Sequence, residues 1–445
     1  MSTSVLDTSG HDHAEQGAVV AGAARTSNFL LATWDGGGHA GPMLSVARAL
    51  LARGHRVRVL ADPSLRDEVV ASGARFVPWQ LAPHRPAGAA GGEVVFRDTD
   101  ANGPAGAATR ARDGLICGPA IHFAADCRRE LHRERADVVV ADHMLPGALV
   151  AAEAELIRTV SLATTLMMVP EWGVPAMGLG LAPPRGPISR LRCAALAHAA
   201  TRMWRKGLPA YNAARVANHL DPIGEPLEMF SRWDRVLICS SAAIEFPTFD
   251  PPAHVSLVGA RLDDPAWAST PWAPPRGEAP LVLVGLSSSF MDQGDLLTRT
   301  AAALGRLRTH GVVTTGPAID PATVAAPANV TVVRSAPHAQ VLRHASAVVT
   351  HGGHGTVAKA LAAGVPVVAL PLGRDQHDVA QRVVTAGAGL RLDASSSPER
   401  IAAAVRTVLE RPEYARAARR VADVMAAERR EDRAVAALEA LVLSR

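Results

Sequence analysis

Short apolar runs alternate with helical patterns through the first half of the chain. Residues 28–34 are apolar and lead into glycines, residues 43–51 carry apolar positions at helical spacing, and residues 57–61 alternate as in a strand. This order predicts a strand, a glycine-rich turn, a helix and a second strand. A helix is also predicted around 121–133. The remaining predicted strands are 74–79, 137–141, 158–163 and 235–239.

The same alternation restarts after residue 280. Strands are predicted at 281–285, 311–315, 330–334, 347–350 and 365–370, with helices at 296–310, 339–344 and 356–363. From Pro398 onward the pattern is helical, with a break at Pro412. Strands that alternate with helices predict an α/β fold of two doubly wound, Rossmann-like domains.

A proline-rich stretch separates the two halves, with eight prolines between residues 246 and 280. We therefore expect the following parts: a disordered tail in 1–27, an N-terminal domain in 28–248, a linker in 249–279, a C-terminal domain in 280–425, and a C-terminal helix in 426–445 that packs back on the N-terminal domain. Ligands of open α/β sheets bind at the carboxyl ends of the strands, so both domains are expected to face one central cleft.

Composition narrows the class of protein. The chain has 445 residues, of which 48% are hydrophobic and 20% charged, as in folded globular proteins. The net charge is only +4, and no lysine- and arginine-rich run interleaves with aromatic residues, so no nucleic-acid partner is expected. Four scattered cysteines fit thiols in a reducing cytoplasm. The start of the chain lacks the pattern of a signal peptide, and charges interrupt the longest apolar stretch, 138–157. A cytoplasmic protein without stable membrane association is expected.

A glycine-rich turn in the second half predicts an anion site. A buried strand ends at Thr350, and a helix follows the sequence His351-Gly352-Gly353-His354-Gly355-Thr356. Glycines let the backbone approach a ligand, and the free N–H groups of a helix start attract a phosphate or diphosphate. Asp375 and Gln376, after the next strand, offer the acceptors and donors that sugar hydroxyls require. Each piece alone fits a turn or a solvated loop, but their joint spacing favours a site.

The first glycine turn allows two interpretations. Gly36, Gly38 and Gly41 fit the G-x-G-x-x-G pattern, and Asp62 ends the next strand, as in an NAD(P)-dependent oxidoreductase. Pro42, however, suits the first turn of a helix, and His39 stands where bare backbone would cradle a pyrophosphate. The second domain also already offers a phosphate site.

The segment 336–376 resembles the family 1 glycosyltransferases, which include plant secondary-metabolite and bacterial natural-product enzymes. The matching residues are Ala336-Pro337, Val341-Leu342, His351-Gly352-Gly353, Gly355-Thr356, Ala363-Gly364-Val365-Pro366, Pro371 and Asp375-Gln376. The resemblance implies a GT-B fold and an inverting, metal-independent sugar transfer from a nucleotide sugar. That donor is a co-substrate, so no cofactor is expected. A monomer and a homodimer both remain possible.

The resemblance also implies a set of donor-binding residues. They are Ser287, Ser288, Pro337, His351, Gly353, Gly355 and Thr356 around the diphosphate, and Asp375 and Gln376 at the sugar hydroxyls. Two positions depart from the plant pattern. Ser335 stands where an aromatic residue commonly stacks on the base, and Lys359 stands where a glutamate holds the ribose hydroxyls. The donor can therefore be a dTDP-sugar or a UDP-sugar.

The turn Gly38-His39-Ala40-Gly41-Pro42 is similar to the Gly-His-x-x-Pro turn of the same family, which makes His39 the candidate general base. An acceptor hydroxyl needs a base, and histidine changes charge near working pH. Asp142, just beyond the predicted strand 137–141, is the candidate partner that orients the histidine and compensates its charge. Asp142 could instead cap the helix that follows, and His143 could compete for the catalytic role.

The N-terminal domain is expected to hold the acceptor. Candidate contacts are apolar or aromatic residues near its loops, namely Trp79, Phe123, Met144, Met167, Met168, Trp172 and Met177. They favour a hydrophobic, hydroxylated natural product such as a polyketide, macrolide or flavonoid-like compound. A lipid-linked acceptor is less favoured, because no basic amphipathic helix is evident. A catalytically silent sugar-nucleotide-binding protein is the non-enzymatic alternative.

Overall fold

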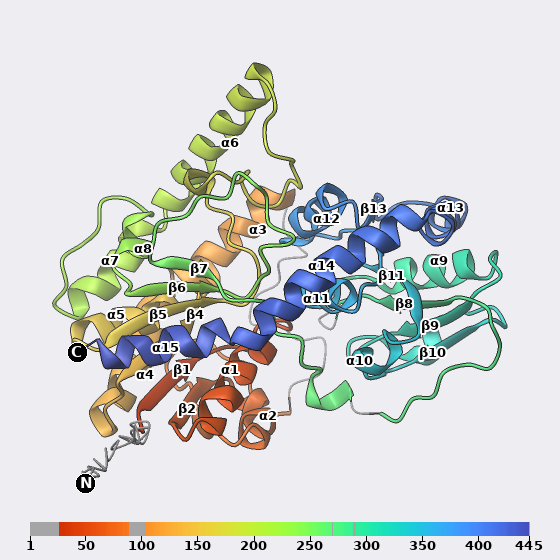
Figure 1. Cartoon of the computed structure of the whole chain (residues 1–445). Helices are drawn as coiled ribbons and strands as arrows, with labels where there is room; N and C mark the ends of the chain where they lie inside the picture. The colour runs from red at the N-terminus through yellow and green to blue at the C-terminus, as the bar shows by residue number, and fades with distance from the viewer. Residues whose placement is uncertain (1–25, 89–102, 269, 288–290, 445) are drawn as a thin grey trace, which may run out of the picture.

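The computed structural model describes residues 26–88, 103–268, 270–287 and 291–444. Two parallel sheets lie side by side, each with helices on both faces (Figure 1). The predicted α/β fold is therefore confirmed. Among the helices of the described residues, none combines the length and the apolar character that a membrane crossing requires.

The N-terminal sheet has seven strands in the order β3-β2-β1-β4-β5-β6-β7. Its strands are β1 (Asn28–Ala32), β2 (Arg56–Ala61), β3 (Arg75–Pro78), β4 (Val138–Asp142), β5 (Arg158–Ala163), β6 (Arg235–Ile238) and β7 (Val255–Leu257). The helices around them are α1 (Ala40–Ala52), α2 (Arg66–Ala71), α3 (Gly103–Ala111), α4 (Ala120–Arg133), α5 (Pro146–Ala154), α6 (Pro187–Arg205), α7 (Leu208–Ala217) and α8 (Glu228–Ser231).

Strand β7 lies inside the stretch that the prolines marked as a linker. Pro251 and Pro252 precede it, and the short run from Val255 to Leu257 pairs in parallel with β6. Val255 is buried in the core of the N-terminal domain. Three residues suffice for an edge strand, so the connection to the second sheet begins after Leu257 and not at residue 249.

The C-terminal sheet has six strands in the order β10-β9-β8-β11-β12-β13. They are β8 (Leu281–Gly285), β9 (His310–Thr314), β10 (Val330–Val333), β11 (Ala345–Thr350), β12 (Val367–Ala369) and β13 (Gly389–Arg391). The helices are α9 (Gly294–Leu304), α10 (His338–Val341), α11 (His354–Ala362), α12 (Gln376–Thr385), α13 (Pro398–Glu410), α14 (Pro412–Glu431) and α15 (Arg433–Leu443).

The strand orders decide where ligands can bind. In the first sheet the order reverses between β1 and β4, which pair at Ala32 and Ala141. In the second sheet it reverses between β8 and β11, which pair at Gly285 and Thr350. The loops that leave such neighbouring strands diverge to opposite faces and leave a crevice, the usual binding place in open α/β sheets. Each domain therefore has a crevice at these carboxyl ends.

The end of the chain ties the two domains together. Helix α14 packs on α11, and α15 then crosses to the N-terminal domain, where it contacts α1 and β4 (Figure 1). Ala434, Val435 and Leu438 of α15 are fully buried in the N-terminal core. The turn between α14 and α15 is at Asp432, whose φ of 38° is left-handed and ends the helix.

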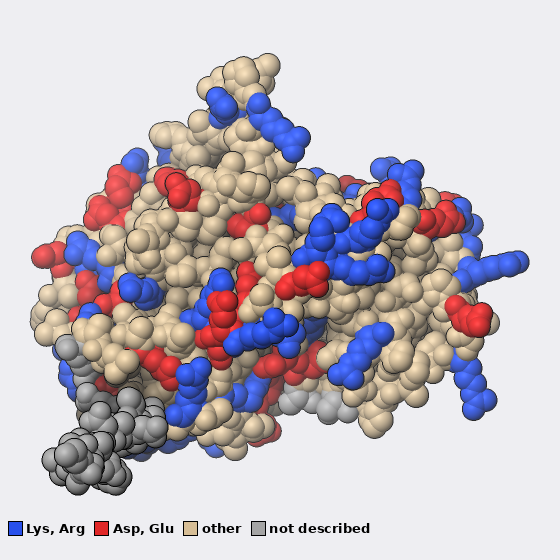
Figure 2. Space-filling view, in the orientation of Figure 1, with Lys and Arg blue, Asp and Glu red and all other residues tan. Residues whose placement is uncertain are grey.

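Basic and acidic side chains are interspersed over the face that Figure 2 shows.

Candidate active site

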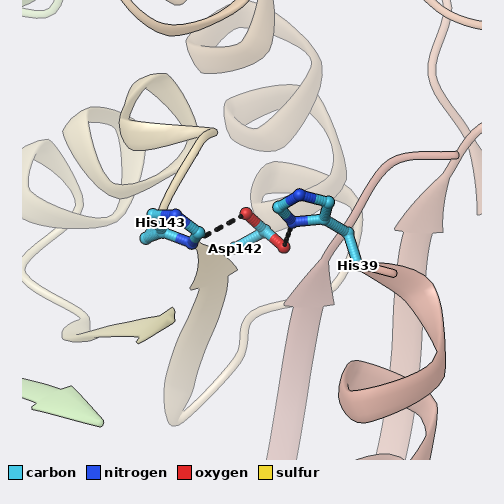
Figure 3. Close-up of side chains that lie close together, drawn as sticks. All are labelled: His39, Asp142 and His143. Carbon is cyan, nitrogen blue, oxygen red and sulfur yellow. Dashed lines mark hydrogen bonds and ion pairs between the residues drawn. The ribbon is translucent and has the colours of Figure 1, made fainter. Parts of the chain in front are cut away.

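Two histidines flank a buried aspartate at the carboxyl ends of β1 and β4 (Figure 3). Nδ1 of His39, which precedes α1, lies 2.9 Å from Oδ2 of Asp142, the last residue of β4. Nδ1 of His143 lies 3.3 Å from the other carboxylate oxygen, Oδ1. The rings of the two histidines stack at a centroid distance of 5.7 Å. The strand reversal between β1 and β4 thus brings together residues that are 103 positions apart in the sequence.

The glycines before His39 are explained by local packing. Gly36 lies against the Trp34 indole, which a Cβ would meet, and Gly37 has a φ of 77° that side chains disfavour. Asp62 is fully buried, and its Oδ2 accepts a hydrogen bond from the Asp35 amide. The turn therefore serves to aim His39. Asp62 serves to hold the turn, and because it is fully buried and does not line the cavity it is not open to a ribose.

Asp142 is ionised in this setting. Burial alone raises the pKa of Asp142, but the charges and hydrogen bonds of His39 and His143 hold it well below its ordinary value. The carboxylate receives the Nδ1 proton of His39, which leaves Nε2 of that ring to take a proton. Oδ1 also accepts from the Met144 amide at 2.9 Å, which fixes the loop after β4. The helix-cap alternative for Asp142 is wrong, because the N-cap of α5 is Leu145.

Two further side chains shape the surroundings of His39. The hydroxyl oxygen of Thr164 lies 3.0 Å from Nδ1 of His39, and the Trp34 ring lies 4.8 Å from the imidazole. Neither was among the predicted site residues. Thr164 directly follows β5, the neighbour of β4, so a polar residue at the end of that strand was the signal that could have found it.

His39, Asp142 and His143 could each offer one ligand atom to a metal ion, since these atoms lie within 4.8 Å of one another. In this arrangement the same atoms form the hydrogen bonds and ion pairs of the cluster. These contacts suit a histidine base that a carboxylate holds in place.

The second crevice is built around the start of α11. Gly352 has a left-handed φ of 87°, and a Cβ at Gly353 would collide with the His351 ring. His354, Gly355 and Thr356 form the first turn of the helix and line a cavity, and nothing lies within 4 Å of a Cβ built on Gly355. The N–H groups of this turn lack partners inside the helix, so they are free to bind an anion.

His351 closes this crevice as a neutral ring. Burial lowers the pKa of His351 to about 4, so it carries no charge at neutral pH and can donate a hydrogen bond without repelling other cations. Ser287, after β8, lines the same cavity. Ser288 lies outside the described residues. Pro337 does not line the cavity and instead begins the short helix α10 as its N-cap.

Asp375 and Gln376 differ in how far their side-chain polar atoms are already used in hydrogen bonds within the protein. Both line the cavity, but the Gln376 side chain is 2% exposed. Its Oε1 accepts from the amides of Leu372 and Gly373 at 2.8 and 3.1 Å, so it shapes the loop as much as it offers groups to a ligand. Asp375 accepts a hydrogen bond from the Thr165 hydroxyl of the other domain. Arg374, in the loop between β12 and Asp375, also lines the cavity. Its backbone has a left-handed φ of 55°.

Further contacts join the two domains beside this site. Asp378 accepts hydrogen bonds from the amides of Gly178 and Gly180 at 2.6 and 2.9 Å. Arg391 donates to the Gly180 carbonyl at 2.8 Å. Burial raises the pKa of Asp378 to about 6 in spite of the two amide donors. The loop that follows β5 in the N-terminal domain is therefore fastened to the domain that carries Asp375.

One cavity of about 890 Å³ runs between the two crevices. Its N-terminal wall holds the predicted contacts Met144, Met167, Met168 and Met177. Trp204 of α6, Phe230 of α8 and Trp233 also lie on this wall and were not among the predicted contacts. A polar end is formed by Asp35, Ser64, Glu68 and Arg85.

Three predicted acceptor contacts belong to the core instead. Trp79 is 1% exposed and donates its indole N–H to the Thr33 carbonyl, and Phe123 packs edge-on against it. Trp172 is buried between Phe230 and Phe249. None of the three lines the cavity. Their rings fill the layer beneath the wall, where a large apolar side chain is most stable.

Known proteins share this fold and sequence. The family described as erythromycin biosynthesis protein CIII-like, C-terminal domain, matches residues 298–441. A 4'-demethylrebeccamycin synthase from Lentzea aerocolonigenes is 32% identical over 431 residues, which cover 94% of this chain and 100% of that protein. An oleandomycin glycosyltransferase from Streptomyces antibioticus is 28% identical and covers 91% of this chain and 88% of its own length.

Solved structures agree with the fold. The glycotransferase of kitacinnamycin has a TM-score of 0.74 at 23% identity, covering 94% of this chain and 99% of its own. The glycosyltransferase VinC, solved in complex with dTDP, has a TM-score of 0.63 at 19% identity and covers 94% of this chain and 100% of its own. Both comparisons extend over the two domains together.

The sequence relatives and the fold together identify a glycosyltransferase of the GT-B type, in which two Rossmann-like domains face a central cleft. The chain belongs to the bacterial natural-product branch of the family 1 glycosyltransferases. The resemblance expected from residues 336–376 is thereby confirmed, and the oxidoreductase interpretation of the first glycine turn finds no support.

Proposed function

We propose that the protein moves a sugar from a nucleoside-diphosphate sugar to a hydroxyl of a hydrophobic natural product, with inversion at the anomeric carbon. One observation carries this proposal. His39, which Asp142 holds from behind, and the anion-binding start of α11 line the same cavity, one from each domain. A base for the acceptor and a cradle for the leaving group are what a direct displacement needs.

The reaction follows from this placement. Nε2 of His39 takes the proton of the acceptor hydroxyl, and the acceptor oxygen bonds to the anomeric carbon. The bond from that carbon to the β-phosphate oxygen breaks, its electron pair stays on the phosphate, and the nucleoside diphosphate leaves. Asp142 compensates the charge on the His39 imidazolium, as carboxylates do in hydrolase triads. The N–H groups at the start of α11 and the neutral His351 ring meet the charge that grows on the diphosphate.

Donor and acceptor are assigned by chemistry. Asp375 lines the cavity, and in this proposal its carboxylate accepts hydrogen bonds from the sugar hydroxyls. The base of the nucleotide is uracil or thymine, and relatives solved with thymidine diphosphate favour testing dTDP-sugars first. The methionine- and tryptophan-rich wall suits a large apolar acceptor, such as a polycyclic or macrocyclic one, which shares the cavity of about 890 Å³ with the donor. Relatives named for rebeccamycin and oleandomycin steps support the same class.

The experiment is a panel of UDP- and dTDP-sugars offered with hydrophobic hydroxylated acceptors, followed by the release of nucleoside diphosphate. The proposal expects release that depends on the acceptor for at least one pair. Tight binding of a nucleotide sugar without turnover under any pairing would favour the catalytically silent alternative. No binding of any nucleotide sugar would overturn the proposal.

A further inference from the structure

The segment that joins the two sheets lies against the donor crevice. Asp264 accepts from Lys359 Nζ of α11 at 2.7 Å and from the Ala339 amide of α10 at 3.0 Å. Six residues later, the Thr270 hydroxyl lies 2.9 Å from the hydroxyl of Ser335. The preceding residue, Asp263, forms an ion pair with Arg48 of α1, in the other domain. The segment is thus anchored at Asp263 to the N-terminal domain and at Asp264 and Thr270 to the C-terminal domain.

These anchors coincide with the two positions where the C-terminal domain has an unusual residue. Ser335 offers no aromatic ring, and Lys359 offers no carboxylate. Asp264 brings a carboxylate to Lys359, and Thr270 brings the linker to Ser335. The linker therefore lies beside both positions at which the C-terminal domain lacks an aromatic ring or a carboxylate.

The proposed function leaves one part of the donor, its nucleoside, to be assigned to the cavity. The diphosphate belongs at the start of α11, and the sugar belongs toward Asp375 and His39. The cavity also continues along α10 and α11, where Ser335, Ala336, His338 and Lys359 line it from the domain and Asp264 and Trp267 from the linker. The diphosphate and the sugar are assigned elsewhere, so we assign the nucleoside to this continuation of the cavity along α10 and α11.

Trp267 has the properties of a base-stacking residue. It lies on the short helix Ala266–Ala268, three residues from each of the anchors Asp264 and Thr270. Its side chain lines the cavity and is nevertheless 43% exposed. An indole that faces a binding cavity offers a broad π surface, and stacking on such a surface accepts uracil and thymine alike.

We infer that the interdomain linker completes the nucleoside site of the donor beside the C-terminal domain, with Trp267 stacking on the base and Asp264 positioning the linker. This inference rests on the proposed function, because it assigns the donor's nucleoside to a particular part of the proposed site. It also means that the nucleotide contacts the segment on which any relative movement of the domains depends.

Calorimetry with the full-length chain tests the inference, with UDP, dTDP and inorganic pyrophosphate as probes. Trp267→Ala should weaken UDP and dTDP binding by about tenfold to a hundredfold, while pyrophosphate binding stays as in the wild type. Trp267→Phe should recover much of the loss. Trp272→Ala is the matched control, since this second linker tryptophan packs near His344 and does not line the cavity. It should leave all three affinities unchanged.

The role of Asp264 is tested by a double-mutant cycle. Asp264→Ala should weaken nucleotide binding, but should add little in the Trp267→Ala background, because it acts through the placement of Trp267. Equal affinities of the wild type and Trp267→Ala for UDP and dTDP would overturn the inference and leave the proposed function standing. So would a parallel loss of pyrophosphate binding. Failure of the wild type to bind any nucleotide would instead remove the proposed function.

Discussion

Replacement of Asp142 by asparagine isolates the charge that holds the proposed base. The asparagine keeps the size of the side chain and an oxygen that can accept from the Met144 amide. It removes the negative charge 2.9 Å from Nδ1 of His39. Because Asp142 is fully buried, solvent cannot replace that charge.

The magnitude follows from Coulomb's law. An imidazolium and a carboxylate whose charges are about 4 Å apart attract by about 4 kcal/mol at an effective dielectric constant of about 20. This attraction is gained only as His39 takes the proton, so its loss raises the barrier. At about 1.4 kcal/mol for each factor of ten, the rate should fall about a thousandfold.

The assay is the initial rate of nucleoside diphosphate release, with donor affinity measured by calorimetry. Asp142→Asn should lower kcat and leave the affinity for the donor nucleotide unchanged. Asp126→Asn is the matched control, because Asp126 is a buried aspartate that accepts from the amides of Gln80, Leu81 and Ala82, away from the cavity. It should cost stability and spare kcat. A loss of less than tenfold in Asp142→Asn, or an equal loss in both variants, would refute the reasoning.

The remaining predictions concern the base, the sugar, the domain contact and metal ions. His39→Ala should lower kcat by at least about a thousandfold and His143→Ala by less than about tenfold, and the opposite order in the same rate assay would make His143 the base. Asp375→Ala should lower kcat/KM by about tenfold to a hundredfold but leave the Kd of the sugar-free nucleoside diphosphate unchanged, and an equal loss of both would assign Asp375 elsewhere. Burial raises the pKa of Asp378 from 3.8 to about 6, so the folded chain holds this proton more tightly than the unfolded chain, and the resulting stability is lost as the pH rises through 6. We therefore expect the Tm of Asp378→Asn minus the Tm of the wild type to be larger at pH 7.5 than at pH 4.5. Thermal melts that give the same difference at both pH values would contradict this. Chelation with EDTA should leave the rate unchanged, and a loss that added magnesium reverses would show a metal requirement.

The parts of the fold that depend on local pattern were predictable from the sequence. Buried strands followed by glycine turns and helices marked both crevices, because each turn needs backbone that only glycine supplies easily, as at Gly37 and Gly352. The strand order then explains why His39 and Asp142 meet, since polar residues after neighbouring parallel strands converge at one sheet edge.

Features that depend on distant packing were not predictable in this way. Trp79 and Trp204 are both aromatic, yet the first fills the core and the second lines the cavity, and their local sequences do not distinguish the two fates. Val255 pairs as an edge strand inside a proline-rich stretch, because β6 offered a free edge. Gln376 matched the sugar-binding motif, but its carboxamide also closes its own loop.

The most direct test of the central claim measures both products of one reaction. Wild-type protein, a nucleotide sugar and a hydroxylated acceptor are incubated together, and nucleoside diphosphate and acceptor carrying one added sugar are quantified by mass spectrometry. The account predicts the two in equal amounts, with neither formed above background by His39→Ala. Nucleoside diphosphate released without any glycosylated acceptor, or full product from His39→Ala, would contradict it.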